Sequence, residues 1–158
     1  MTEIIQIITA TVGSLGFGIL FNVRKKRLIA VGLGGGAAWA LYLFFDMITG
    51  SLGVSYFLVS LLVSLYAEAM ARIFKSPTLV FISPSLIPLV PGASLYYTMS
   101  HALSQKTELF LGSALTTLTA AAALAIGIIV GAVVAKLLTK LNYIIYARTL
   151  KQKKGEHK

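Results

Sequence analysis

The chain has 158 residues, of which 57% are hydrophobic and 12% charged, with a net charge of +9 and no cysteine. A soluble domain of this size could not bury that much apolar surface, so the composition predicts a polytopic membrane protein. The absence of cysteine excludes disulfides, thiolate metal sites and cysteine nucleophiles.

Hydrophobic runs predict an all-α fold with five transmembrane helices, because each run is close to the ~20 residues that cross a bilayer. The runs cover about residues 4–21, 28–45, 52–73, 79–99 and 110–138. Residues 46–51 are expected to form a turn, and residues 101–108 a polar loop. We therefore expect residues 1–141 to form a five-helix transmembrane domain and residues 142–158 a basic cytoplasmic tail, disordered from Lys151 onward.

Basic residues alternate between the predicted loops and indicate how the chain is oriented. Asn22, expected to end the first span as a helix cap, is followed by Arg24–Arg27. Arg72 and Lys75 lie at the end of the third span, and a basic tail follows the fifth. The loop after the second span has no basic residue, and the loop after the fourth has only Lys106. The positive-inside rule therefore predicts an external N-terminus and a cytoplasmic C-terminus. Such clusters also contact anionic lipid, and no nucleic-acid-binding motif accompanies them.

The predicted fourth span is interrupted by Pro84, Pro88, Pro91 and Gly92. A proline inside a helix removes a backbone donor and costs about 3 kcal/mol. Broken backbone at membrane depth persists only where it is packed in protein or lines a wet cavity, and discontinuous helices often form the site of a transporter. These four residues and Tyr96 are predicted to bind substrate or to act as a gate. A kink filled by neighbouring helices, with no ligand, is the alternative.

Hydroxyl side chains near the interruption allow two interpretations of the same atoms. They could bind a small polar solute, or they could satisfy backbone carbonyls that the prolines leave free; the residues are Ser83, Ser85, Ser94, Tyr96 and Tyr97. Three threonines in the fifth span could face the same cavity, although hydrogen bonds to their own helix are favoured; they are Thr116, Thr117 and Thr119.

Glu68 and Arg72 are a charged pair inside the predicted third span. Residues four apart share a helix face, and glutamate N-terminal to arginine is the favourable order. A carboxylate at this depth is costly unless it is paired, protonated or beside water. The pair is therefore predicted to be either a structural ion pair at the membrane edge or a carboxylate that couples proton or substrate movement.

Small residues recur at intervals of four, a spacing that lets helix backbones approach closely. They form two stripes: Gly32, Gly36 and Ala40 in the second span, and Ala123, Gly127, Gly131 and Ala135 in the fifth. Packing within the chain is favoured for each stripe, and a subunit interface, including that of a homo-oligomer, is the alternative.

Catalytic and metal-binding patterns are nearly absent from the sequence. The two histidines, His101 and His157, do not have the spacing of metal ligands. Both lie outside the predicted spans, so neither can activate a serine within the membrane. We therefore expect no cofactor, no metal site and no enzyme activity.

Four short stretches of the chain resemble the threonine/serine exporter family. They are FNVR at residues 21–24, AEAMAR at 67–72, KSP at 75–77 and IPLVPG at 87–92, the last followed by Tyr96. The resemblance extends over about residues 4–140 and is to the small, five-span integral membrane subunit of that family.

The resemblance implies export of threonine, serine or related small amino acids or carboxylates across the cell membrane, driven by an ion gradient, and we expect the coupling ion to be a proton. It also implies a second five-span subunit that carries a cytoplasmic N-terminal domain. Such a partner would begin inside and end outside, so the two units would form inverted repeats. Glu68, Arg72, Pro88, Pro91, Gly92 and Tyr96 are the site residues that it implies. A scaffold subunit that transports nothing itself is the alternative function.

Overall fold

The computed structural model describes residues 1–155, and the side chains of residues 1–140. The described chain is all-helical, with these elements: α1 (Thr2–Leu20), α2 (Lys26–Thr49), α3 (Leu52–Ile73), α4 (Leu79–Leu86), the 3₁₀ helix η1 (Ile87–Leu89), α5 (Gly92–Leu103) and α6 (Thr107–Gly155). Four of the described helices are long and apolar enough to cross a membrane, and α4–η1 with α5 makes a fifth candidate span bent by 55°. The predicted all-α membrane fold with a broken fourth span is confirmed.

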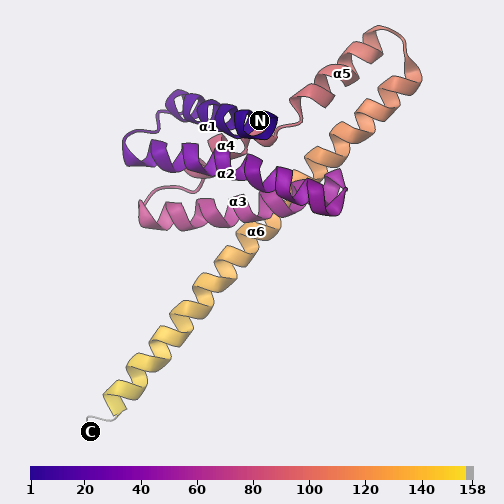
Figure 1. The fold of residues 1–158 in the computed structure, drawn as a ribbon. Helices are drawn as coiled ribbons and strands as arrows, with labels where there is room; N and C mark the ends of the chain where they lie inside the picture. Colours follow the sequence, from indigo (N-terminus) through magenta and orange to yellow (C-terminus); the bar gives the residue numbers. More distant parts are fainter. Residues whose placement is uncertain (156–158) are drawn as a thin grey trace.

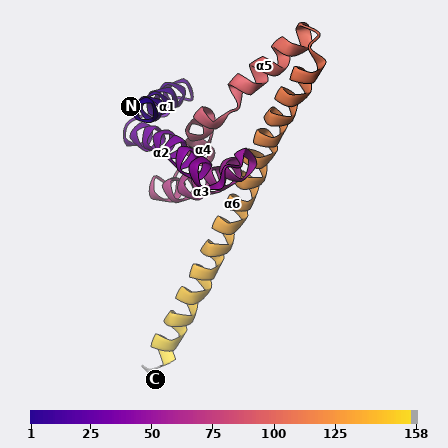
Figure 2. The ribbon, with the colours of Figure 1, turned by 45° about the vertical axis from the view of Figure 1, so that its right-hand side comes forward.

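Helices α1, α2 and α3 form an up-and-down bundle into which α4 and η1 are packed (Figure 1). Phe81 and Leu89 are fully buried there, and the aromatic ring of Phe81 stacks on that of Phe74. Helix α5 leaves this bundle and packs mainly against the first half of α6, so that the two form a separate hairpin (Figure 2). Hydrogen bonds join them at Thr98–Thr117 and His101–Ser113, with lengths of 3.2 and 3.1 Å.

The glycine stripe of α2 lets α1 approach closely. A Cβ atom on Gly32 would lie 2.7 Å from Leu15 Cδ2, and one on Gly36 would meet the Thr11 hydroxyl. A Cβ atom on Gly35 would meet the Ser14 side chain in the same way. This stripe packs within the chain, as predicted.

The stripe of α6 packs against α3 by the same means. Gly127 lies against Ser60, and a Cβ atom on Gly131 would lie 2.7 Å from Ser64 Cβ. The Ser64 hydroxyl also donates a 3.2 Å hydrogen bond to the carbonyl oxygen of Ile128. The intramolecular interpretation of this stripe is confirmed too.

The contacts between α3 and α6 advance in step along both helices. Gly53 faces Thr119 near the start of α3, whereas Arg72 reaches Ala135 near its end. The two helices therefore run in the same general direction (Figure 1).

Several predicted boundaries need correction. The turn expected at residues 46–51 is wrong, because α2 continues to Thr49. Gly50 ends it in a left-handed conformation with φ 58°, and its amide donates to Asp46 O over 3.0 Å. The loop expected at residues 101–108 is shorter, since α5 runs through Leu103 and α6 begins at Thr107.

The predicted end of α1 agrees with the structure, whereas the predicted end of α6 does not. Asn22 ends α1 with φ 58°, and the next amide, of Val23, donates back to Gly18 O over 2.9 Å, which is the hydrogen bond of a Schellman cap. At the other end, α6 extends to Gly155, so disorder from Lys151 onward is wrong for residues 151–155. Residues 156–158 of the predicted tail lie outside the described residues.

Candidate functional site

The three prolines of the fourth span occupy three different backbone environments. Pro84 lies inside α4, which continues through it, and Pro88 is near the start of η1, a position that tolerates proline. Pro91 precedes α5, and Val90 before it is extended, with φ −62° and ψ 126°. A residue before proline is disfavoured in helical conformation, so the bend falls at Val90–Pro91.

Most of the first half of this broken span is buried in the protein. Pro84 and Ser85 are fully buried, and the Ser85 hydroxyl donates to the carbonyl oxygen of Val31 over 3.4 Å. Ser94, beyond the bend, donates to the carbonyl of Pro91 over 3.1 Å. In this structure both hydroxyls therefore bind backbone carbonyls.

The threonines of α6 also bind backbone. Thr116 and Thr117 donate to the carbonyl oxygens of Gly112 and Ser113 over 3.0 and 2.8 Å. The prediction that they bond to their own helix is confirmed.

A cavity of about 250 Å³ opens beside Pro88. Its lining combines Pro88 with Gln6, Thr9 and Ala10 of α1 and Trp39 of α2. The Trp39 Nε1–H donates to Gln6 Oε1 over 3.2 Å, which leaves the amide –NH₂ of Gln6 as a donor at the edge of the cavity. These groups can present both donors and acceptors to a small polar solute.

Sequence reasoning missed the roles of Gln6 and Trp39. Neither residue is among the sequence-predicted site residues, although both line the cavity beside Pro88. An amide in an otherwise apolar span is the signal that could have identified Gln6, because such groups face protein or water rather than lipid.

Gly92 and Tyr96 lie on α5, away from the Pro88 cavity. No residue of α5 is buried by the described part of the chain, and Tyr96 is 67% exposed. A Cβ atom on Gly92 would meet no described atom within 4 Å. The structure therefore brings Pro88 together with Gln6 and Trp39, and does not bring Tyr96 to the same place.

Glu68 joins three helices. Its Oε1 lies 3.3 Å from Arg72 Nη2, and its Oε2 accepts a 2.6 Å hydrogen bond from the hydroxyl of Thr78, just before α4. Arg72 Nη2 also donates to the carbonyl oxygen of Ala135 in α6 over 3.2 Å. The predicted ion pair forms, and a cavity of about 470 Å³ lies beside it.

The two groups of predicted site residues lie at opposite ends of α4–η1. Thr78, which contacts Glu68, and Pro88, which lines the cavity, are ten residues apart in sequence. At a rise of 1.5 Å per residue, about 15 Å separates them. Any connection between the two must therefore run along α4, because they share no cavity.

Comparison with known proteins identifies the family. The sequence pattern of the family described as "Threonine/Serine exporter, ThrE" matches residues 6–134. The chain belongs to the threonine/serine exporter family. The matched residues include Gln6, the Pro88 cavity, the bend and the Glu68–Arg72 pair. No curated protein and no solved structure matches the chain.

Membership of the threonine/serine exporter family confirms the resemblance drawn from the four sequence stretches. The chain is thus a multi-pass membrane component of an exporter family and not of an enzyme family. Among the residues that the structure describes, no group of three or more histidine, aspartate or glutamate side chains could hold a metal ion.

Proposed function

We propose that this chain is the membrane subunit of a proton-coupled secondary exporter for threonine, serine or related small amino acids or carboxylates, working with a second five-span subunit. The observation that carries the proposal is the bent fourth span of an exporter-family chain, whose buried half lines a cavity at Pro88 that also contains the side chains of Gln6 and Thr9. Broken helices at such sites give transporters the free backbone and the polar surroundings that a charged solute needs.

The substrate is assigned to the cavity beside Pro88. An amino acid in water is a zwitterion, so its site must replace hydrogen bonds at both charged ends. The Gln6 –NH₂ group can donate to a solute in this cavity and the Thr9 hydroxyl oxygen can accept, while the Trp39 indole N–H holds the Gln6 carbonyl oxygen.

The gate is assigned to the bend, with Pro84, Pro91, Gly92 and Tyr96 as its residues. Pro84 is packed in the bundle, so α4–η1 forms the fixed half. Gly92 has open space around it and no residue of α5 is buried by the described part of the chain, which makes α5 the half that can swing, whereas α6 stays packed against α3. Tyr96 moves with that half. Rotation at the bend would expose the cavity to one membrane face at a time.

Proton coupling is assigned to Glu68 and acts at a distance from the substrate. Protonation of this carboxylate would weaken its ion pair with Arg72 and its hydrogen bond from Thr78. The hydrogen bond from Thr78 holds the start of α4, and the other end of α4–η1 carries Pro88. A change at Glu68 can therefore reach the cavity through α4 without direct contact.

A second subunit and an orientation complete the proposal. Exposed apolar side chains on α5, among them Leu95, Met99 and Leu103, offer a surface to a five-span partner with a cytoplasmic N-terminal domain. The distribution of basic residues places the N-terminus outside the cell and the C-terminus in the cytoplasm.

The test is efflux from cells preloaded with labelled threonine or serine, with the chain expressed alone and with its candidate partner. Gln6→Leu removes the cavity amide, and Thr9→Val removes a hydroxyl without changing its shape. Thr139→Val is the matched control, because Thr139, like Thr9, bonds a carbonyl of its own helix and lies outside the cavity. Loss of a polar contact to the solute should reduce efflux about tenfold for Gln6→Leu and leave Thr139→Val unchanged.

The outcomes separate the parts of the proposal. Efflux that requires the partner and falls in Gln6→Leu supports a two-component exporter with its site at Pro88. Full efflux in Gln6→Leu would exclude the Pro88 cavity as the substrate site. Partner-dependent efflux in which these variants alter only assembly would make the chain a scaffold, and absence of efflux with both proteins inserted would remove threonine and serine as substrates.

A further inference from the structure

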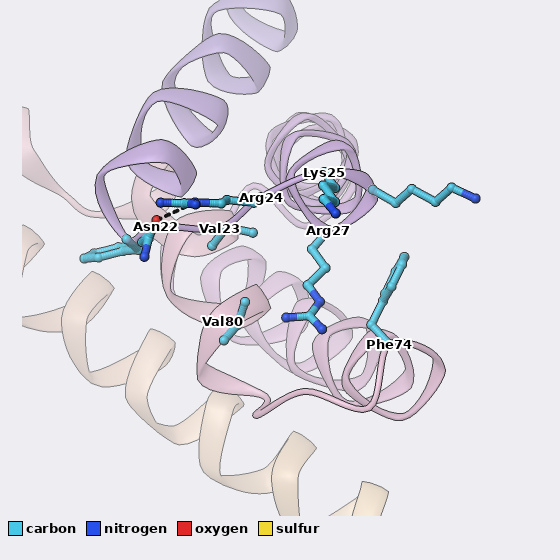
Figure 3. Close-up of a pocket in the computed structure, with 9 residues that line it drawn as sticks. Asn22, Val23, Arg24, Lys25, Arg27, Phe74 and Val80 are labelled. Atoms are coloured by element: carbon cyan, nitrogen blue, oxygen red, sulfur yellow. Dashed lines mark hydrogen bonds between the residues drawn. The ribbon is translucent and has the colours of Figure 1, made fainter.

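A strongly basic groove lies at the end of the bundle where α1 turns into α2. Arg24–Arg27 surround it, and Phe21, Phe74 and Val80 contribute apolar surface (Figure 3). Its volume is about 740 Å³, the largest of the cavities described above. We call this space the basic groove.

The backbone of the α1–α2 turn holds these cations in place. Asn22 and Lys25 both have left-handed conformations, with φ 58° and 60°, in which residues other than glycine are uncommon. Arg24 Nε donates a 2.8 Å hydrogen bond to Asn22 Oδ1, and Val23 between them is buried. Figure 3 shows Arg24 lying along Asn22 while Arg27 extends between Val80 and Phe74. The charged groups therefore enter the groove from defined positions.

No carboxylate of the described residues neutralises this charge. The ion pair between Arg72 and Glu68 is the single salt bridge found among residues 1–140, and it lies outside the groove. Helix α2 begins at Lys26 without a side-chain cap, so its free amides add to the positive potential. Four neighbouring cations repel each other, and an anion bound between them would relieve that repulsion.

The surroundings of the groove favour a lipid over a soluble anion. The groove lies at the ends of spans α1, α2 and α3, the level at which lipid headgroups meet the protein. Phe21 is 54% exposed beside it, and Phe74 and Val80 line the wall that Arg27 approaches. A phosphate ion would leave these apolar walls in contact with water, whereas the glycerol and upper acyl carbons of a lipid would cover them.

We propose that the basic groove binds the phosphate headgroup of an anionic phospholipid, with Arg24 and Arg27 at the phosphate and Phe21 against the glycerol and upper acyl chain. Guanidinium groups suit the phosphate because they donate two hydrogen bonds in a planar fork. The bound lipid bridges the α1–α2 turn to the α3–α4 connection. This site is independent of the Pro88 cavity, so it stands whether or not the chain exports threonine.

The test measures binding to the purified full chain in mild detergent. The probes are short-chain phosphatidylglycerol, phosphatidylcholine with the same acyl chains, glycerol 3-phosphate and inorganic phosphate, and bound ligand is counted by native mass spectrometry. Each cation near an anionic lipid surface strengthens binding about fivefold. Arg24→Gln/Arg27→Gln should therefore weaken phosphatidylglycerol binding about 25-fold. Lys106→Gln/Lys140→Gln removes the same charge outside the groove and should leave binding unchanged.

Each other result overturns the proposal. Equal weakening in both double variants would mean a general effect of net charge. Binding of phosphatidylcholine as tight as that of phosphatidylglycerol would exclude headgroup recognition, and equally tight binding of glycerol 3-phosphate or inorganic phosphate would make the groove a site for soluble phosphate. If the first double variant does not fold, Arg27→Gln alone keeps the Arg24–Asn22 hydrogen bond and should lose about fivefold; unchanged binding there contradicts the proposal.

Discussion

The hydroxyl of Thr78 donates a 2.6 Å hydrogen bond to the carboxylate of Glu68, ten residues earlier in the chain. This contact ties the start of α4 to α3. Arg72 extends the connection to α6, because it contacts both Glu68 and the carbonyl oxygen of Ala135. Helices α3, α4 and α6 are thus connected through the Glu68–Arg72 pair.

Thr78→Val should therefore loosen the start of α4. Valine has the same shape as threonine, so the change removes the hydrogen bond and leaves one carboxylate oxygen without this donor. We expect the free energy of unfolding to fall by about 1 kcal/mol, measured by thermal unfolding of the purified protein in detergent. Thr116→Val, which removes an exposed hydroxyl that bonds the carbonyl oxygen of Gly112 in its own helix, is the control and should change little. Equal stability of the two variants would mean that the hydrogen bond between Thr78 and Glu68 does not stabilise the fold.

Glu68→Gln tests the proton role of the carboxylate. Glutamine keeps the shape and can still accept from Thr78, but it carries no charge and cannot take up a proton. If Glu68 couples transport to protons, stimulation of export by an inward proton gradient should fall by at least about fivefold, since coupling energies are typically 1 kcal/mol or more. The measurement is efflux from vesicles with and without an imposed gradient. Unchanged stimulation would leave Glu68 as a structural ion pair.

Gly127→Ala should disturb the contact between α3 and α6. Its Cβ atom would lie 2.6 Å from the carbonyl oxygen of Phe57, so the two backbones would have to separate. Overpacking of this kind costs about 1–3 kcal/mol. Gly112→Ala on the same helix is the matched control, because no described atom lies within 4 Å of its added Cβ, and it should gain about 0.5 kcal/mol from helix propensity. Thermal unfolding in detergent compares them, and a neutral Gly127→Ala would contradict the packing described for α6.

Gly92→Ala separates gating from folding. The added methyl group meets open space in this structure, so the free energy of unfolding should stay within about 0.5 kcal/mol of wild type. If the bend opens and closes about Gly92, restricting its backbone should still slow efflux. Gly13→Ala in α1, which also meets open space, is the control for the substitution itself. Wild-type efflux by Gly92→Ala would exclude this residue from the gate.

Trp39 provides an intrinsic reporter of the proposed substrate site. It is the chain's single tryptophan, and its indole donates to Gln6 beside Pro88. Threonine entering this cavity should change the polarity around the ring, so its fluorescence should shift in a saturable way. Leucine, which has the same charged ends and a larger apolar side chain, should have a weaker effect. The shift should be lost in Gln6→Leu, and a response equal to wild type would exclude the cavity as the site.

The helices could be predicted because hydropathy and length act locally. Three of the expected spans begin and end within a few residues of α1, α3 and the apolar part of α6. The error at α2 has a local cause as well: Asp46 was interpreted as the start of a turn, although only Gly50 takes the left-handed conformation that stops the helix. Polar residues near a helix end thus indicated the turn four residues too early.

The candidate site could be predicted only in part, because its contacts depend on how helices rotate against each other. The Glu68–Arg72 pair follows from a spacing of four along one helix, whereas Thr78 joins it only after α4 folds back. Gln6 and Trp39 are 33 residues apart, and they meet because the glycines of α2 bring α1 close. No pattern in either span alone contains that information.

The shared direction of α3 and α6 bears on how many times the chain passes through the bilayer. A helix that entered and left on one side would deliver α6 to the face where α3 ended, and the two would then have to point in opposite directions. Because they point the same way, we expect the bent segment between them to be a complete passage despite its break, the fifth of the candidate spans. Five passages would put the start of α1 and the end of α6 in different aqueous compartments, in agreement with the orientation predicted from the basic residues.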